Sequence, residues 1–402
     1  YKNVDSKDFA DIYVFNTCSV TENANKETRK LIRRSKRINP NAFITLIGCY
    51  AQLKPEELID IKDVNLVLGT ADKFDLLSHL DKIDTSGDIK SSIGGNINDI
   101  KIFNPSFSND DRTRSFLKVQ DGCDYSCTFC TIPLARGRSR SSSINKTINI
   151  AKDISRTNTK EIVLTGINIG DFGKGTNESF YDLIKQMDSQ IDIERFRISS
   201  IEPNLLNDKI IEFCFQSKKF MPHFHIPLQS GSNKMLKSMK RRYTSQEYSD
   251  RLNKIKSLDQ DACIGVDVIV GYPRESEEDF FETYNFLKNH DVSYLHVFTY
   301  SERENTKAIK IEPVVPYEER ARRSKILREL SDQKRVNFYE RSVGQIRPVL
   351  VEKSKNGILF GYTDNYIKTR IQGHISLENT IQNVFISEAK LGYVESEVVS
   401  IN

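Results

Sequence analysis

Between residues 115 and 301, short apolar segments with strand character alternate with helical patterns. Amphipathic stretches such as 179–190 and 276–290 lie between the strands. The candidate strands cover residues 115–120, 161–166, 195–200, 223–228, 263–271 and 294–301. Six strand–helix repeats over roughly 220 residues are typical of a barrel or partial barrel of parallel strands. Because active sites in such barrels lie at the carboxyl ends of the strands, the repeat also predicts where chemistry takes place.

The residues before this region show the same alternation on a smaller scale. Residues 10–20, 42–52 and 65–70 read as strands, and residues 22–38 and 54–61 read as helices. Strands that alternate with helices predict a parallel α/β sheet. In such a sheet the ligand site lies beyond the carboxyl ends of the strands, where Cys18 and Cys49 fall.

The two remaining parts of the chain differ in composition. Residues 86–101 are polar and rich in glycine, which indicates a linker. After a charged helix at 316–343, short strands with turn signals predict a small all-β barrel. The chain is therefore predicted to be a multidomain α/β protein with an α/β domain at 1–85, a linker at 86–112, the partial (β/α) barrel at 113–340 and the all-β barrel at 341–402.

Composition and charge narrow the class of protein. Of the 402 residues, 38% are hydrophobic and 28% are charged, which fits a soluble protein with real cores. No apolar run reaches the roughly 18 residues that a membrane span requires. The net charge is +4, with basic clusters at 29–37, 135–141, 240–242 and 320–323. Such clusters are either solvated helix faces or contacts to a polyanion.

Three of the seven cysteines lie in the segment QDGCDYSCTFC, residues 120–130. Their neighbours are polar, so Cys123, Cys127 and Cys130 do not read as core residues, whereas Cys214 and Cys263 do. Thiolates bind soft metals and iron–sulfur clusters, and a structural zinc site would require a fourth ligand. Seven cysteines without a regular framework also favour a reducing cytoplasm over disulfides.

The C-x-x-x-C-x-x-C segment resembles the motif of the radical SAM enzymes. In that superfamily the three cysteines ligate three irons of a [4Fe–4S] cluster, and the fourth iron binds S-adenosylmethionine. The resemblance implies that Cys123, Cys127 and Cys130 are the catalytic cluster ligands. It further implies that an electron from the cluster cleaves the cofactor to a 5′-deoxyadenosyl radical.

The order of the domains is similar to that of the methylthiotransferases, which convert a C–H bond to C–SCH3. These enzymes carry an N-terminal cluster domain, a radical SAM barrel and a C-terminal TRAM barrel. By this resemblance Cys18, in NTCSV, and Cys49, in IGCYAQ, are the second and third ligands of a second [4Fe–4S] cluster. The first ligand is expected before Tyr1, so the N-terminal domain reads as truncated.

Several segments resemble one branch of this family, which acts on N6-threonylcarbamoyladenosine at position 37 of tRNA. The segments are CTIPLARGRSRS (130–141), TGINIGDFG (165–173), RISSIEP (197–203), HIPLQSGSNKMLKSMKRRYT (225–244), GVDVIVGYPRESEEDF (265–280) and GYTDNYIKT (361–369). One departure is YSERENTKA (300–308), where the family more often has a glycine before the threonine. The alternative substrates are isopentenyladenosine in tRNA and a ribosomal protein. An alternative from another class is a non-catalytic iron–sulfur protein that binds RNA.

The resemblance also implies roles for individual residues. The residues expected to contact S-adenosylmethionine are Phe129, Gly166, Asn168, Ser200, Glu202, Gln229 and Asp267. The residues expected to contact RNA are Arg136, Arg138, Arg140, Tyr366, Lys368 and Arg370. The glycine could instead be a turn residue, and the three arginines could form a solvated loop. The expected partners are a tRNA anticodon stem-loop and an electron-donor protein, with no membrane.

Overall fold

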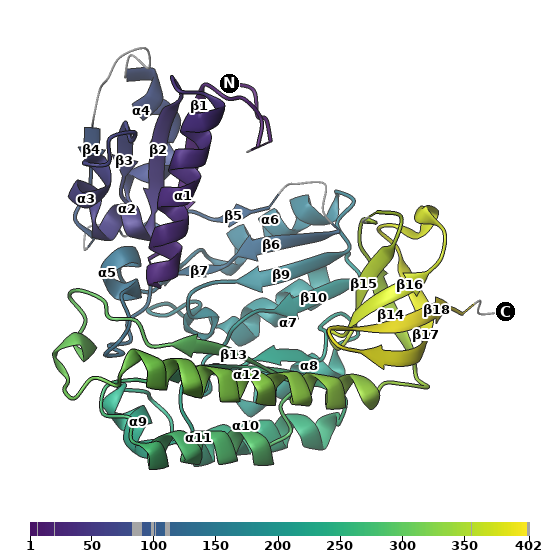
Figure 1. Ribbon diagram of the computed structural model, residues 1–402. Helices are drawn as coiled ribbons and strands as arrows, with labels where there is room; N and C mark the ends of the chain where they lie inside the picture. The colour runs from purple at the N-terminus through teal and green to yellow at the C-terminus, as the bar shows by residue number, and fades with distance from the viewer. Residues whose placement is uncertain are drawn as a thin grey trace. The chain divides into compact units, whose positions relative to one another are not determined.

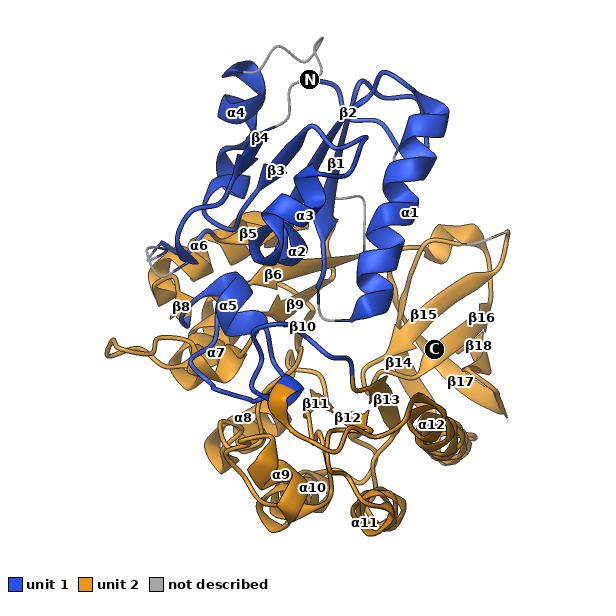
Figure 2. Ribbon diagram, turned by 60° about the vertical axis from the view of Figure 1, so that its left-hand side comes forward, with its two compact units in different colours: residues 1–104, 122–139, 301–309 blue, residues 105–121, 140–300, 310–402 orange. Residues whose placement is uncertain are grey.

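The computed structural model describes residues 1–5, 7–19, 21–82, 91–97, 100, 102–108, 113–354 and 356–399. The chain divides into two compact units (Figure 2). Unit 1 contains residues 1–104, 122–139 and 301–309, and unit 2 contains residues 105–121, 140–300 and 310–402. The segment that holds Cys123, Cys127 and Cys130 therefore belongs to the same unit as the N-terminal sheet.

Unit 1 is built on a parallel sheet of four strands in the order β1-β2-β3-β4. The strands are β1 (Ile12–Thr17), β2 (Phe43–Gly48), β3 (Leu66–Leu68) and β4 (Ser91–Ile93). The helices are α1 (Glu22–Ile38), α2 (Cys49–Leu53), α3 (Pro55–Ile59), α4 (Leu76–Lys82) and α5 (Ile132–Arg136). The first begins at a Thr21 cap, whose hydroxyl accepts from the Ala24 amide.

Unit 2 contains an open barrel of six parallel strands (Figure 1). They are β6 (Arg114–Lys118), β9 (Glu161–Thr165), β10 (Arg195–Ile198), β11 (His223–His225), β12 (Cys263–Val270) and β13 (Tyr294–Thr299). Isolated parallel bridges between Phe196 and Phe220 and between Ser200 and His225 join its two sheets. The short β5 (Ser106–Phe107) pairs antiparallel with β6, and β7 (Gln120–Asp121) pairs with β8 (Arg140–Ser141).

The helices of unit 2 cover the outer face of this barrel. They are α6 (Ile144–Ser155), α7 (Phe180–Gln190), α8 (Asp208–Gln216), α9 (Asn233–Ser238), α10 (Ser245–Leu258), α11 (Glu277–Asn289) and α12 (Tyr317–Glu340). Apolar residues at alternate strand positions, such as Leu164, Phe196 and Val266, are fully buried in this core. Because side chains alternate along a strand, the residues between them face the barrel interior.

The end of the chain forms a closed barrel with the strand order β14-β15-β16-β18-β17. The strands are β14 (Ile346–Val351), β15 (Leu359–Thr363), β16 (Lys368–Gln372), β17 (Ile381–Lys390) and β18 (Tyr393–Val398). Interior arginines of β10 attach it to the open barrel. Arg195 Nη2 donates to the Pro348 carbonyl at 2.9 Å, and Arg197 Nη1 donates to the Asp364 carbonyl at 3.1 Å.

The predicted parallel α/β region, partial barrel and terminal all-β barrel are all confirmed. Two details differ from the sequence prediction. Residues 91–93, inside the predicted linker, form β4, and residues 49–52 of the predicted second strand belong to α2. Residues 83–90 and 109–112 of the predicted linker region and its flank lie outside the described residues. Across the described part of the chain, no helix has the length and apolarity of a membrane span.

Candidate functional site

The three-cysteine segment is a tight loop that follows β7. Gly122 has φ of 74°, and a Cβ there would lie 2.0 Å from the Arg138 carbonyl oxygen, so the close return of the chain requires glycine. The Cys123 amide donates to the Gly137 carbonyl at 3.0 Å, and the Cys130 amide donates to the Cys127 carbonyl at 3.2 Å. These contacts fold the loop back on itself.

The sulfur atoms of this loop have the surroundings of iron–sulfur ligands. All three cysteines are half-buried free thiols. The Tyr125 amide donates to Cys123 Sγ at 3.4 Å, and the Ile132 amide donates to Cys130 Sγ at 3.4 Å. Hydrogen bonds from backbone amides to the ligand sulfurs tune the potential of such clusters. The half-buried Phe129 lies in the same loop, so the residues present fit a [4Fe–4S] cluster.

Cys18 and Cys49 lie at neighbouring positions of the parallel sheet in unit 1. Thr17 and Gly48 are register partners at the carboxyl ends of β1 and β2, and each cysteine comes one residue later. Cys18 is exposed and Cys49 is buried. Arg136, which ends α5 beyond the three-cysteine loop, donates from Nε to Cys49 Sγ at 3.0 Å. The helix that follows the three-cysteine loop thus contacts Cys49 within one unit.

The predicted cofactor residues of unit 2 begin with a turn after β9. Gln120 Oε1 accepts from the Ile167 amide at 3.0 Å and from the Asn168 amide at 2.8 Å. A Cβ on Gly166 would lie 3.0 Å from the Gln120 carbonyl oxygen and 2.7 Å from Ile169 Cγ2, so glycine permits this approach. Asn168 is 2% exposed, and among the described residues its Oδ1 has no hydrogen-bond partner. An orphaned buried acceptor is what an absent ligand leaves.

Three further cofactor candidates follow β10 and β11. Ser200 bridges to His225, and Glu202 forms a largely buried ion pair with Arg241. Gln229 has φ of 67° and its amide donates to the Asp267 carbonyl at 2.8 Å. A non-glycine residue with positive φ is uncommon and clusters at functional sites. Arg241 also lies 5.1 Å from the Tyr243 ring centroid.

Asp267 lies within β12 and faces the barrel interior, not beyond the end of its strand. Its Oδ1 atom contacts His225 Nε2 at 2.9 Å and His296 Nδ1 at 3.1 Å. Burial acts to raise the pKa of Asp267, but the hydrogen bonds from the two histidines outweigh it and lower the pKa to about 2. The carboxylate is therefore ionised at neutral pH.

The predicted RNA-binding residues lie in unit 1, beside the open barrel of unit 2 and in the terminal barrel. In unit 1, Arg138 is exposed and Arg136 contacts Cys49. In unit 2, Arg140 pairs with Asp121 at 3.3 Å. In the terminal barrel, Lys368 lies 5.0 Å from the Phe360 ring centroid, Arg370 pairs with Glu395 at 3.0 Å, and Tyr366 stacks on His223 with the ring centroids 4.3 Å apart.

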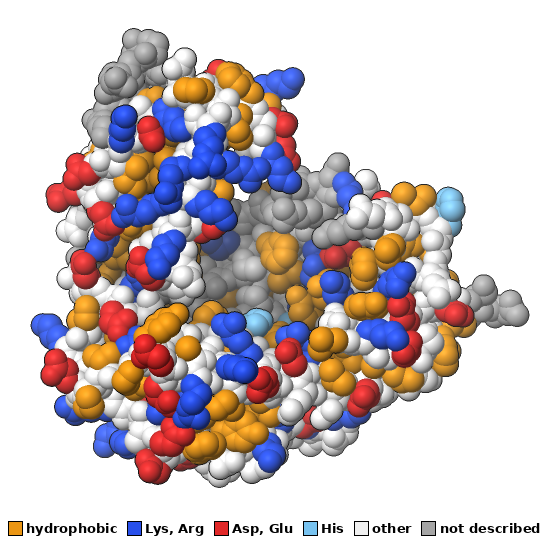
Figure 3. All heavy atoms as spheres, in the orientation of Figure 1, with side chains coloured by type: hydrophobic (Ala, Val, Ile, Leu, Met, Phe, Trp, Pro, Cys, Tyr) orange, Lys and Arg blue, Asp and Glu red, His pale blue; other side chains and the backbone are white. Residues whose placement is uncertain are grey.

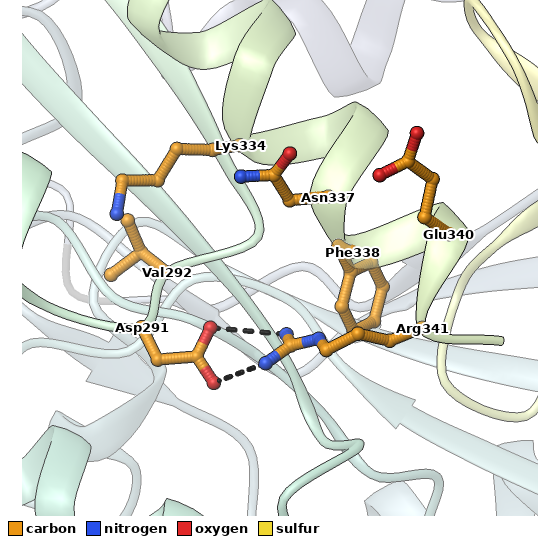
Figure 4. Close-up of a pocket in the computed structure, with 7 residues that line it drawn as sticks. All are labelled: Asp291, Val292, Lys334, Asn337, Phe338, Glu340 and Arg341. Carbon is orange, nitrogen blue, oxygen red and sulfur yellow. Dashed lines mark hydrogen bonds and ion pairs between the residues drawn. The ribbon is translucent and has the colours of Figure 1, made fainter.

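Two pockets of unit 2 differ in whether predicted site residues line them. The first, of about 560 Å³, is lined by Asp291, Val292, Lys334, Asn337, Phe338, Glu340 and Arg341 and contains none of the predicted site residues (Figure 4). Asp291 and Arg341 face each other there at 2.8 and 3.0 Å. The second, of about 260 Å³, is lined by His296, Tyr366, Lys368 and Arg335 among others.

Lysine and arginine side chains also gather over α1 on the face shown in Figure 3. Lys26, Arg33, Arg34 and Arg37 are exposed, and the ion pairs of the described residues do not involve any of the four. Such a row is the electrostatic surface that a polyanion contacts.

Sequence reasoning did not single out His225, His296, Arg241 or Gln120. A usable signal was present in the segments HFH and YLHVF, where period-two alternation places both histidines on the face opposite the helices. For Arg241 and Gln120 the sequence carries no such signal, because both act through partners more than 35 residues away, at separations of 39 and 48.

Comparisons with known proteins agree with this geometry. Residues 117–287 match the Radical SAM superfamily, and residues 1–69 match the family described as "Uncharacterized protein family UPF0004". The threonylcarbamoyladenosine tRNA methylthiotransferase MtaB of Bacillus subtilis is 40% identical over 414 residues, which cover 100% of this chain and 91% of the relative. Its Aquifex aeolicus counterpart is 39% identical, covering 93% and 90%.

More distant relatives share the class. The tRNA-2-methylthio-N(6)-dimethylallyladenosine synthase of Acetivibrio thermocellus is 31% identical over 99% of this chain and 85% of its own. A structure of the radical S-adenosylmethionine methyltransferase TsrM from Kitasatospora setae has a TM-score of 0.54 at 11% identity, covering 87% of this chain and 68% of that one, which supports the fold alone.

The open barrel and its three-cysteine loop are those of a radical SAM enzyme, a class whose members use a [4Fe–4S] cluster and S-adenosylmethionine. Within that class the chain belongs to the methylthiotransferase family, and in it to the MtaB-like branch, since relatives at 34–40% identity span most of its length.

Proposed function

We propose that this methylthiotransferase adds a methylthio group to C2 of N6-threonylcarbamoyladenosine at position 37 of tRNA. The observation that carries the proposal is the 40% identity to the Bacillus subtilis enzyme over the whole chain. The relative named for dimethylallyladenosine is less similar, at 31%. That modified base is therefore the second candidate substrate.

Residues of both units support the chemistry. Cys123, Cys127 and Cys130 would hold the radical SAM cluster, and a [4Fe–4S] cluster with S-adenosylmethionine supplies radical chemistry that can activate a C–H bond. The orphaned Oδ1 of Asn168, at the end of β9, suits a hydrogen-bond donor of the cofactor. Glu202, paired with Arg241, offers a carboxylate near the end of β10. Phe129, Gly166, Ser200 and Gln229 complete the set that we assign to this cofactor.

We further propose that Cys18 and Cys49 are ligands of a second [4Fe–4S] cluster. The support is their position at the paired ends of β1 and β2, together with the Arg136 hydrogen bond to Cys49 Sγ at 3.0 Å. A cationic donor to a ligand sulfur stabilises charge on the reduced cluster. Reduction of both clusters requires an electron-donor protein.

The RNA partner would be an anticodon stem-loop. The exposed arginines of α1 offer phosphate contacts, and Arg138, Lys368 and Arg370 offer further cationic groups. Loop bases of RNA are accessible outside a helix, so the target base can be presented to the enzyme. A tRNA substrate and seven free cysteines favour the cytoplasm.

The deciding experiment is mass spectrometry of tRNA nucleosides from cells that lack the gene. We expect the 2-methylthio form of threonylcarbamoyladenosine to disappear and to return with the wild-type gene, but not with Cys127→Ala. If that nucleoside persists while the dimethylallyl form is lost, the second candidate substrate is correct. If neither changes, the proposed function is wrong.

A further inference from the structure

Three polar side chains meet inside the open barrel on adjacent strands. His225, Asp267 and His296 come from β11, β12 and β13, and Asp267 is the register partner of His296. One ligand atom of each lies within 4.8 Å of the other two. The cluster sits among interior positions rather than in the helix-covered core, where Leu295 and Val266 lie.

The hydrogen bonds fix how both imidazoles are turned. Asp267 is ionised and can only accept, so His225 Nε2 and His296 Nδ1 must both carry protons. The opposite nitrogen of each ring is thereby directed away from Asp267. The His296 side chain is 51% exposed, and among the described residues no hydrogen bond involves its Nε2 atom. An exposed, oriented imidazole inside a barrel is placed to meet a ligand.

The surroundings favour an anionic ligand. His296 lines the pocket of about 260 Å³ together with the cationic Arg335 and Lys368 and the aromatic Tyr294 and Tyr366. Among the described residues that line this pocket, none is Asp or Glu, so its cationic side chains favour an anion.

We infer that His296 binds the carboxylate of the threonylcarbamoyl group on the substrate base, with Asp267 and His225 as positioning residues. The inference rests on the proposed function, since it names the part of that substrate that the cluster recognises. When His296 is protonated at both nitrogens, its Nε2–H can donate a charge-assisted hydrogen bond to the carboxylate. Asp267 accepts from Nδ1 on the opposite side of the ring and so directs Nε2 toward the pocket.

The same arrangement discriminates against an apolar substituent. A dimethylallyl group provides no acceptor for His296 and would leave its Nε2 atom without a hydrogen-bond partner in the pocket. Sites built to hydrogen-bond a polar group reject analogues that lack it far more strongly than apolar pockets reject a change of size. The cluster would therefore separate the two kinds of modified adenine.

The test varies both the protein and the RNA. Labelled anticodon stem-loops carry, at position 37, threonylcarbamoyladenosine, its neutral methyl ester or unmodified adenosine, and anaerobically reconstituted full chain is titrated by fluorescence anisotropy. We expect wild type to bind the free acid about 10- to 100-fold more tightly than the ester, the range of a charge-assisted hydrogen bond. His296→Ala should bind both equally, and His374→Ala, at an exposed histidine outside the pocket, should behave as wild type.

Three results would overturn the inference. One is a wild type that does not distinguish acid from ester while still methylthiolating the acid. Another is His296→Ala protein that retains the wild-type preference. A third is stoichiometric zinc in wild type that is lost in the variant, which would make the cluster a metal site. The proposed function itself would be refuted by a different result. In it, wild type binds threonylcarbamoyladenosine and its methyl ester no more tightly than unmodified adenosine and methylthiolates none of the three RNAs.

Discussion

Arg197 joins the open barrel to the terminal barrel, and its removal gives a sharp test of how unit 2 holds together. Its Nε and Nη2 atoms donate to the two oxygens of Glu161 at 3.1 and 3.0 Å. Nη1 reaches the Asp364 carbonyl at 3.1 Å, and the Tyr366 ring centroid lies 4.9 Å from its guanidinium carbon. The Glu161 side chain is 2% exposed, so its charge depends on these contacts.

We predict that Arg197→Met destabilises unit 2 strongly, because it leaves the Glu161 carboxylate buried without its main partner. Burial acts to raise the pKa of Glu161, and Arg197 holds that pKa below its usual value. Breaking a buried pair from one side costs about 3–5 kcal/mol. Arg114 and Arg195 still lie near Glu161 and offset part of the loss, which favours the lower end, about 3 kcal/mol. At roughly 2–4 °C per kcal/mol for domains of this size, Tm falls by roughly 6–12 °C.

Thermal unfolding followed by circular dichroism on anaerobic protein measures this change. The double variant Glu161→Met, Arg197→Met removes both charges, so its loss should be smaller than the sum of the single losses by about 0.5–3 kcal/mol. Arg156→Met, which breaks the exposed pair with Asp153, is the matched control and should change stability by less than about 1 kcal/mol. An Arg197→Met protein that melts like the control, or strictly additive losses, would refute the reasoning.

Three further predictions concern pH, the second cluster and RNA. Burial lowers the pKa of His223 well below the usual value for histidine, so below about pH 6.5 the unfolded chain binds a proton that the folded chain does not, and stability falls by up to about 1.4 kcal/mol per pH unit. His223→Gln should flatten this slope in denaturation series between pH 7.5 and 5.5. Arg136→Gln should weaken retention of the second cluster about 10- to 100-fold, measured as iron loss to a chelator. Arg33→Glu with Arg34→Glu should lower the salt slope of stem-loop binding by about 2.

Each of these predictions has a control. His374→Gln, at an exposed histidine, should keep the wild-type pH slope. Arg138→Gln should retain the second cluster, because Arg138 is exposed and the described donor to Cys49 Sγ is Arg136. Lys325→Glu with Arg328→Glu makes the same charge change on exposed positions of α12 and should alter the salt slope less. A control that changes as much as its test variant contradicts the corresponding assignment.

Local pattern decided much of the architecture and the chemistry. The six interior strands, the parallel N-terminal sheet and the terminal all-β barrel follow from hydrophobic periodicity, which depends on residues close in sequence. The spacing of Cys123, Cys127 and Cys130 identified the class for the same reason, because one loop supplies all three ligands. Sequence also predicted that Cys18 and Cys49 follow strand ends, and β1 and β2 end one residue before them.

The tertiary structure alone decided which distant side chains meet. Asp267 was predicted to follow the end of its strand, but it lies within β12, and pairing of β11, β12 and β13 places it between His225 and His296, from segments 42 and 29 residues away. Arg136 was expected to reach phosphate, but folding of its loop brings it to Cys49, 87 residues earlier. Hydrophobic period fixes which face of a strand is buried. The order of the strands in the sheet and the path of the connecting loops decide which polar groups share the other face. No local sequence pattern encodes that order or that path.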